Sequence, residues 1–247
     1  MPKECAFCPS TAKMSGEHLW SDWMNRLFPH MSQVTFRKLK EDGTSEKEWP
    51  SPELNMTTNI VCKPCNAGWV SRLENDFARP AMTDLITGKR VERISAKRIK
   101  GLALFAFKTA VIANRSLPED EFFFNKSARY AFRDSLTIPH DVSMYLVGLP
   151  KGTERGQIAS RNIYFPEPKN PELALNVCSF FIGQLGFQVV SAKARGPMKL
   201  QCIPAEPNLI FRFYPTLECP LSWPRNKTLS PSAFFDFGNR WNATRRL

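Results

Sequence analysis

The chain has 247 residues, of which 43% are hydrophobic, and it carries a formal net charge of +11. This length suffices for one large domain or two modest ones. The positive excess favours a polyanionic partner, usually nucleic acid, although a merely basic soluble protein is the alternative. The N-terminus has no apolar signal segment, and the longest apolar run, residues 101–113, contains Lys108 and is too short to cross a bilayer. We therefore expect a cytoplasmic protein without a membrane partner.

Seven cysteines divide into two close pairs and three isolated positions. The pairs read Cys5-Ala6-Phe7-Cys8 and Cys62-Lys63-Pro64-Cys65. A pair with two intervening residues directs two thiolates toward one ion, and two such pairs complete the tetrahedral four-cysteine set of structural zinc. The isolated cysteines are expected to be buried thiols in a reducing compartment: Cys178, Cys202 and Cys219.

The long segment between the pairs contains a carboxylate next to a histidine, Glu17-His18, and Asn66 directly follows the last cysteine. Together with the cysteine pairs, these residues resemble the HNH endonucleases, also called ββα-metal or His-Me finger nucleases. The similarity is closest to zinc-bearing members in which C-x2-C, an acidic-His dipeptide and C-x2-C-N follow one another. The resemblance covers roughly the first third of the chain.

The resemblance implies a metal-dependent hydrolysis of phosphodiester bonds, with DNA as the expected substrate and RNA not separated from it by the sequence. His18 corresponds to the general base, since a neutral imidazole can deprotonate the attacking water. Glu17 and Asn66 correspond to oxygen ligands of a catalytic Mg²⁺ or Mn²⁺, and the zinc is a separate structural ion. Free-standing relatives with extra domains often act in phage defence or mobile elements.

Adjacent residues of a regular strand point to opposite faces. Glu17 and His18 can therefore serve one site only if the chain twists there or if the ion lies near the strand edge. We expect residues 15–24 to begin as this strand and to pass into a turn or short helix. Residues 55–61 are the second strand of the motif, and Asn66 is expected to cap a helix that Pro80 interrupts and that ends near Gly88.

Two charged segments are candidate contacts for phosphate groups, with a solvated surface as the alternative for each. The first is a predicted hairpin of residues 34–39 and 44–49 around Asp42-Gly43, with basic residues on its first arm. The second is the basic run of residues 89–100, within which three residues are the predicted nucleic-acid contacts: Arg93, Lys97 and Arg98.

The rest of the chain matches no family pattern that we identify. An apolar helix is predicted at residues 102–114 and another helix at residues 126–136. Residues 142–149, 156–165, 173–192 and 209–214 are rich in β-branched and aromatic side chains, which predicts mostly antiparallel strands. Residues 215–231 are Pro-rich and are expected at the surface.

We therefore expect an α+β protein with two parts. Residues 1–88 form a treble-clef ββα-metal module with structural zinc, and residues 89–247 form a helical plus β region of unassigned function. The rival hypothesis is a non-catalytic zinc module that binds nucleic acid or a protein partner. Neither hypothesis predicts an oligomeric state. Glu74 is expected to be a salt-bridge or packing residue, and His30 and His140 are expected to have no role in catalysis.

Overall fold

The computed structural model describes residues 4–28, 34–39, 45–51, 56–153, 156–165, 173–194, 198–202, 209–215, 222–238 and 241–245. Within these residues, helices combine with one five-stranded sheet and three two-stranded sheets, and every strand pair is antiparallel. The prediction of a mixed α and antiparallel β protein is therefore confirmed. The predictions for Cys202, Cys219 and His30 concern side chains outside the described part.

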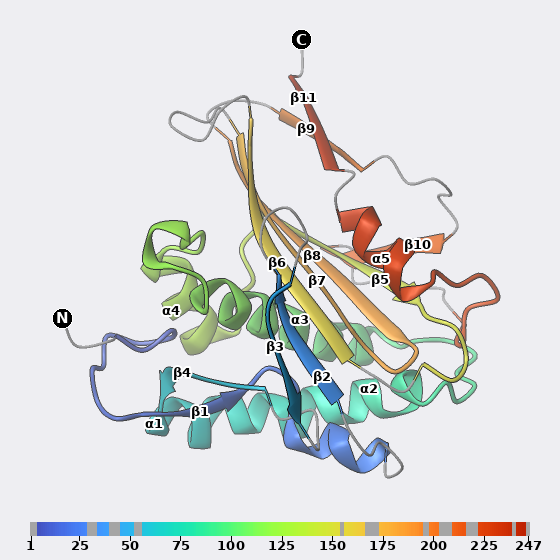
Figure 1. Cartoon of the computed structure of the whole chain (residues 1–247), viewed down its shortest axis with the longest axis horizontal. Helices are drawn as coiled ribbons and strands as arrows, with labels where there is room; N and C mark the ends of the chain where they lie inside the picture. The colour runs from blue at the N-terminus through green and yellow to red at the C-terminus, as the bar shows by residue number, and fades with distance from the viewer. Residues whose placement is uncertain are drawn as a thin grey trace.

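The five-stranded sheet is the largest element of the C-terminal region (Figure 1). In spatial order it consists of β10 (Ile210–Tyr214), β5 (Val142–Gly148), β8 (Leu185–Ala194), β7 (Leu173–Ile182) and β6 (Gly156–Phe165). The strand-forming region predicted at residues 173–192 contains two of these strands, β7 and β8. They are joined by a tight turn in which Gly183 has φ +56, a conformation that glycine adopts without strain.

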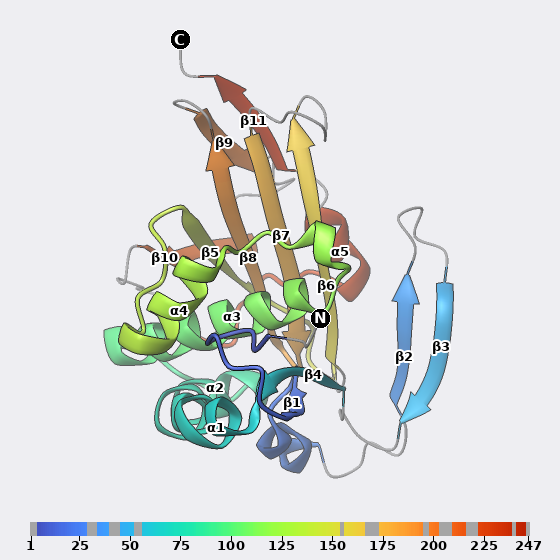
Figure 2. The same ribbon diagram turned by 90° about the vertical axis from the view of Figure 1, so that its left-hand side faces the viewer.

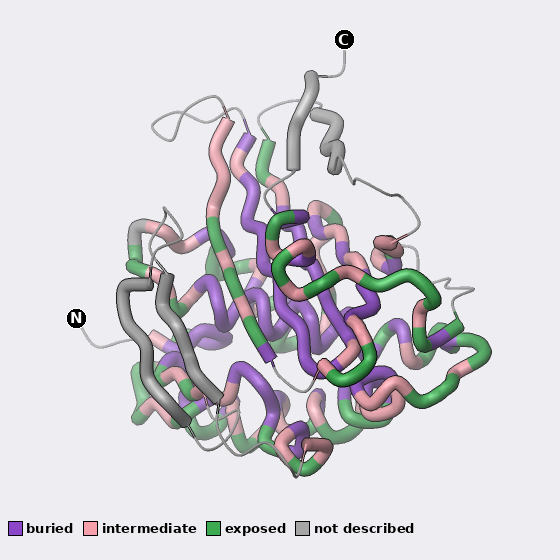
Figure 3. Tube along the Cα trace, turned by 45° about the vertical axis from the view of Figure 1, so that its right-hand side comes forward, coloured by how far each residue is buried: buried purple, intermediate pink, exposed green. Residues whose placement is uncertain are grey.

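A long buried helix, α3 (Ala96–Arg115), covers one face of this sheet. Figure 3 shows buried positions along this helix and along the central strands. Phe105 places its ring 6.2 Å from that of Phe180 and 6.5 Å from that of Phe187, centroid to centroid. All residues from 101 to 114 are buried, as expected of a helix that is packed on every side. The predicted apolar helix is thus confirmed and lies at the centre of the molecule.

The opposite face of the sheet is covered in part by α5 (Pro231–Gly238), whose Phe234 ring lies 6.1 Å from that of Phe181. A separate two-stranded sheet pairs β9 (Met198–Cys202) with β11 (Trp241–Arg245). The helix predicted at residues 126–136 is α4 (Lys126–Ser135), which ends at Leu136 with φ 55. The short turn before it is η4 (Glu119–Glu121).

The N-terminal third contains a strand pair and a separate hairpin. β1 (Met14–His18) pairs with β4 (Thr57–Cys62), and η1 (Asp22–Leu27) follows β1, as predicted. The predicted hairpin is also present as β2 (Val34–Leu39) and β3 (Ser45–Ser51), which pair with each other and with no other described strand. Figure 2 shows this hairpin standing to one side of the other sheets.

A continuous helical segment follows β4 and consists of α1 (Lys63–Cys65), η2 (Asn66–Val70), η3 (Leu73–Ala78) and α2 (Arg79–Ile86). Two expectations are wrong here. The helix begins at Lys63 with Cys62 as its N-cap, so Asn66 lies inside it with φ −62. Pro80 does not interrupt it, because the proline falls in the first turn of α2, directly after the wide turns of η3, where its missing N–H is not required.

The helical segment packs closely on α3. A Cβ at Gly101 would lie 2.5 Å from the carbonyl oxygen of Phe77 and 2.9 Å from Cβ of Ala81, so only glycine allows this approach. The segment ends at Ile86 with Thr87 as its C-cap, and Gly88 follows with φ +69, so the predicted end near Gly88 is confirmed.

Packing is continuous across the predicted domain boundary at Gly88. One core cluster contains residues of the N-terminal strands, the helical segment, α3 and the sheet. Trp223 lies in the Pro-rich segment that was expected at the surface, yet it is 1% exposed and donates its indole N–H to the Leu85 carbonyl at 2.8 Å. In the described part of the chain, no helix has the length and apolar character needed to span a membrane.

Candidate metal centre and the surroundings of His18

The two cysteine pairs are brought together by backbone hydrogen bonds between the first loop and β4. The Ala6 N–H donates to the Ile60 carbonyl at 2.7 Å, and the Lys63 N–H donates to the Lys13 carbonyl at 3.3 Å. The loop containing Cys5 and Cys8 is therefore fixed beside the end of β4, where Cys62 is the last strand residue.

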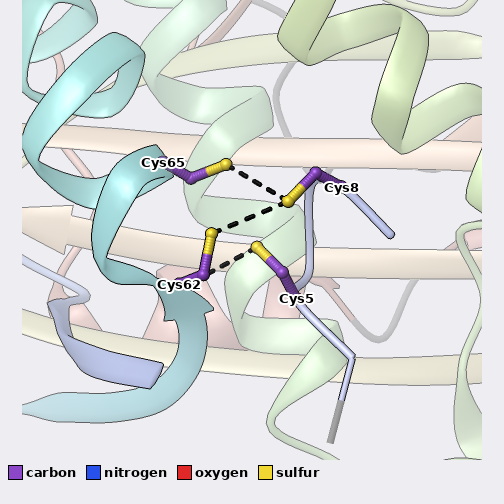
Figure 4. Close-up of side chains that lie close together, drawn as sticks. All are labelled: Cys5, Cys8, Cys62 and Cys65. Carbon is purple, nitrogen blue, oxygen red and sulfur yellow. Dashed lines mark hydrogen bonds between the residues drawn. The ribbon is translucent and has the colours of Figure 1, made fainter. Parts of the chain in front are cut away.

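The four sulfur atoms converge on one point (Figure 4). All four lie within 4.8 Å of one another, and the Cys8 sulfur is 3.6 Å from both the Cys62 and the Cys65 sulfur. The Cys5 sulfur accepts the N–H groups of Phe7 and Cys62 at 3.4 Å and 3.3 Å. In the described part of the chain, these cysteines form the only cluster of at least three His, Cys, Asp or Glu side chains close enough to hold a metal ion. A four-sulfur set suits a zinc ion, as the sequence predicts.

The pKa values of the thiols are shifted in different directions. Burial would raise the pKa of Cys62, but hydrogen bonds with Cys65, Cys5 and Cys8 outweigh burial and lower it. Burial raises the pKa of Cys5 to about 11, although backbone N–H groups partly oppose this effect. Burial also raises the pKa of Cys65, and a charge on Cys5 raises it further. Without a cation, Cys5 and Cys65 stay protonated at neutral pH. Zinc binding must therefore release protons, which makes the affinity for zinc increase with pH.

The helix α4, from the region without an assigned function, is anchored to the first cysteine loop. Arg129 is 3% exposed, and its guanidinium donates to the Ala6 carbonyl and, at 3.5 Å, to the Cys5 carbonyl. Phe132 places its ring 5.7 Å from that of Trp69, edge to face. Formation of the cysteine cluster is thus coupled to packing of the C-terminal region.

A surface hollow of about 570 Å³ adjoins the cysteine cluster. Its lining includes three of the cysteines, the indole of Trp69 and two arginines, Arg72 and Arg133. It is not lined by Glu17, His18 or Asn66. The hollow therefore belongs to the cysteine cluster and does not identify a substrate cleft at the predicted catalytic residues.

Asn66 connects the helical segment to β1. Its side-chain amide donates to the Ser15 hydroxyl and to the Gly16 carbonyl, both at 3.0 Å. His18 is the last residue of β1, pairs with Thr57 and is half-buried. The structure thus places Asn66 against the strand that carries His18. The hydrogen bonds of the Asn66 side chain hold the helical segment against β1, which is a structural role.

Glu17 is turned into the core, where it is 2% exposed. Its Oε1 accepts a hydrogen bond from Lys108 Nζ at 3.0 Å, and the same ammonium donates to Glu74 Oε1 at 2.7 Å. Lys108 belongs to α3 and is fully buried. The salt-bridge role predicted for Glu74 is confirmed. The β1–β4 register shifts between Ser15 and Glu17, so this part of β1 is not a regular strand.

The ion cluster makes a pH-dependent contribution to stability. Burial alone would lower the pKa of Lys108, but Glu74 and Glu17 outweigh burial and raise it above 10.5. Burial also raises the pKa of Glu17, against the opposing effect of Lys108. For a cation with a raised pKa in the folded state, the stabilisation is fully present below the unfolded value and is lost as the pH rises above it.

We expect Lys108→Met to lower the free energy of unfolding by about 3–5 kcal/mol at neutral pH, because it leaves the buried Glu17 and the partly buried Glu74 without a counter-charge. This difference from the wild type should shrink as the pH rises above 10.5, where Lys108 in the unfolded chain loses its proton first. Urea unfolding of both proteins between pH 8 and pH 11.5 measures it. A difference that stays constant over this range would contradict a charged, paired Lys108.

The basic run before and within α3 is only partly available for binding. Arg93 and Lys97 are exposed. Arg98 instead donates to the Asp84 carboxylate, and its side chain is 25% exposed. Of the three predicted contacts, Arg93 and Lys97 therefore retain exposed charges, while Arg98 already has an acidic partner within the chain.

Comparisons of the chain with protein-family models, with curated proteins and with solved structures found no match. The site must therefore be interpreted from its own geometry. Lys108 and Arg129 are the residues that sequence reasoning missed. The role of Lys108 could have been found, because it is the single lysine inside the apolar run of residues 101–113 and a buried lysine requires an acidic partner. Arg129 had no comparable signal.

Proposed function

We propose that the protein is a metal-dependent endonuclease of the HNH type that hydrolyses phosphodiester bonds in nucleic acid, with DNA as the first substrate to test. One observation carries the proposal. The antiparallel pair β1–β4 continues directly into the helical segment, and this ββα unit contains His18, Asn66 and two of the clustered cysteines, while the other two lie in the loop that precedes β1. The net charge of +11 is consistent with a polyanionic substrate.

In the proposed mechanism, the neutral imidazole of His18 accepts a proton from the attacking water. Glu17 and Asn66 are the candidate oxygen ligands for Mg²⁺ or Mn²⁺, which would stabilise the charge that develops on the phosphate and on the leaving oxygen. Zinc at the four cysteines has a structural role and holds the first loop against the helical segment. Because Glu17 Oε1 already contacts Lys108, binding of an ion at Glu17 would have to be shared with this lysine.

The direct test is cleavage of supercoiled plasmid DNA, and of a single-stranded RNA, by the zinc-loaded protein with Mg²⁺ or Mn²⁺. The wild type should cleave one of them only when the divalent ion is present, and His18→Ala should not. His140→Ala is the matched control, because His140 is an exposed loop residue outside the ββα unit. Cleavage that is equal in the two histidine variants would reject the assignment of the site.

The second candidate function is a non-catalytic zinc module that binds nucleic acid or a protein partner. The contacts of Glu17 and Asn66 favour it, since Glu17 pairs with Lys108 and the Asn66 amide bonds to β1. Both residues then have sufficient structural reasons to be present. The same assay separates the two functions, because a binding module shifts the nucleic acid in a gel without cleaving it under any metal condition.

A separate prediction concerns nucleic-acid binding by the basic run before and at the start of α3. Arg93→Glu with Lys97→Glu should weaken binding and reduce the slope of log K against log salt, because fewer counterions are released. Arg98→Gln is the comparison, and it should change the slope less because Arg98 is paired with Asp84. Fluorescence anisotropy at several salt concentrations measures the slopes. Equal slopes in the wild type and the double variant would remove this segment from the binding surface.

A further inference from the structure

The fully buried Lys108 lies at the junction of three elements. It comes from α3, while its two carboxylate partners come from β1 and from η3. Glu17 and Lys108 are 91 positions apart in the sequence. A lysine is almost never fully buried unless it is paired, so the ammonium and the two carboxylates form one unit. This unit connects the helix at the centre of the molecule to the strand that ends at His18.

We propose that Lys108 is a positioning residue for the Glu17-His18 dipeptide, so that the region after Gly88 completes the site. Lys108 acts through Glu17: its ammonium holds Oε1 of that carboxylate and thereby fixes the irregular end of β1. His18 is the next residue on the same strand. The inference rests on the proposed function for its effect on catalysis, but its effect on His18 can be measured without any cleavage activity.

Two features favour positioning over a purely stabilising ion pair. A buried ion pair is a poor source of stability, since apolar residues of similar volume often replace it at no cost. This cluster also has two carboxylates for one ammonium, and a second carboxylate adds repulsion where stability alone would need only one. The Asn66 bond to Gly16 fixes β1 from the other side, so the residues before His18 are held by both α3 and η2.

The test compares Lys108→Met with Glu74→Gln in the full-length, zinc-loaded protein. The first substitution removes the contact to Glu17, and the second leaves that contact in place while changing the other partner of the same lysine. Lys108→Met should lower kcat by about 10- to 100-fold, as loss of a residue that orients a catalytic group typically does. Its affinity for nucleic acid and its zinc content should stay at wild-type values. Glu74→Gln should lower kcat by no more than about threefold.

The second readout is the NMR spectrum of histidine ring carbons, which is simple because the chain has only three histidines. The His18 resonances should shift or broaden in Lys108→Met and stay in place in Glu74→Gln, while the His140 resonances stay unchanged in both. If Lys108→Met does not fold, the double variant Lys108→Met/Glu74→Gln replaces it. This double variant keeps Glu17 as the one carboxylate of the cluster, and Glu17 can take up a proton. It should show the same loss of kcat and the same change in the His18 resonances.

The proposal is overturned if a folded variant lacking Lys108 keeps kcat within about threefold and the His18 resonances of the wild type. It is also overturned if Glu74→Gln loses as much activity as Lys108→Met and shifts the His18 resonances as far. Both variants would then act by disturbing the core as a whole. If the wild type cleaves no nucleic acid, the proposed function fails, and the His18 spectrum alone decides whether Lys108 positions the dipeptide.

Discussion

Cys62→Ser is expected to lose zinc and to unfold the N-terminal part of the chain. Cys62 is the last residue of β4 and the N-cap of α1, and its N–H and sulfur contact two other cysteines of the cluster. Structural zinc contributes on the order of 10–16 kcal/mol of binding free energy in small zinc domains. The net stability of a domain is only about 5–15 kcal/mol. Loss of one ligand can therefore remove most of the free energy of folding.

The unfolding should extend beyond the cysteine loop. Arg129 bonds the backbone of this loop from α4, and the core is continuous between the N-terminal elements and the sheet. Thermal melting followed by circular dichroism should accordingly show one transition that moves to lower temperature, together with loss of zinc in elemental analysis. Cys178→Ala is the control, because this buried cysteine lies outside the cluster. Full zinc content and unchanged melting in Cys62→Ser would refute the four-cysteine assignment.

The parts of the fold that the sequence predicts well are those specified by local pattern. The bounds of β6 agree with the prediction, because alternation and flanking glycine and proline mark a strand at the edge of a sheet. The apolar run of residues 101–113 predicts a buried helix for the same local reason. The two cysteine pairs predict that their four sulfur atoms lie close together, because a tetrahedral zinc ion requires four ligands around one point.

The failures have non-local causes or depend on detailed backbone geometry. Asn66 has the chemistry of an N-cap, but the helix starts at Lys63, where Pro64 suits a first turn. The contact of Glu17 with Lys108 joins residues that are distant in sequence, and no local pattern specifies which carboxylate a buried lysine will meet.

His18→Ala and the variants of Asn66 should fail in different ways if the proposed function is correct. Removal of the imidazole takes away the proton acceptor and leaves the cysteine cluster, Glu17 and Asn66 in place. His18→Ala should keep its fold and its affinity for nucleic acid and lose on the order of 10²–10⁴ in rate, the usual contribution of a positioned general base. Raising Mn²⁺ should not restore the rate, because an additional ion does not replace the base.

Asn66 has two candidate roles, and two substitutions separate them. Asn66→Ala removes the amide oxygen and also the two hydrogen bonds that hold Ser15 and Gly16. Asn66→Asp keeps an oxygen, which binds Mg²⁺ or Mn²⁺ well, but loses the N–H donors. If Asn66 is a metal ligand, Asn66→Asp should retain activity, and Asn66→Ala should recover part of it at high Mn²⁺.

If Asn66 instead holds β1 in place, both substitutions should lose activity together, and added Mn²⁺ should rescue neither. Titration of supercoiled plasmid cleavage with Mn²⁺ for the three variants distinguishes these results. Rescue of His18→Ala by the metal, without rescue of Asn66→Ala, would show that the roles of base and ligand are reversed. Full activity in all three variants would place the active site elsewhere, because the reaction would then need neither the His18 imidazole nor the hydrogen bonds of Asn66 to β1.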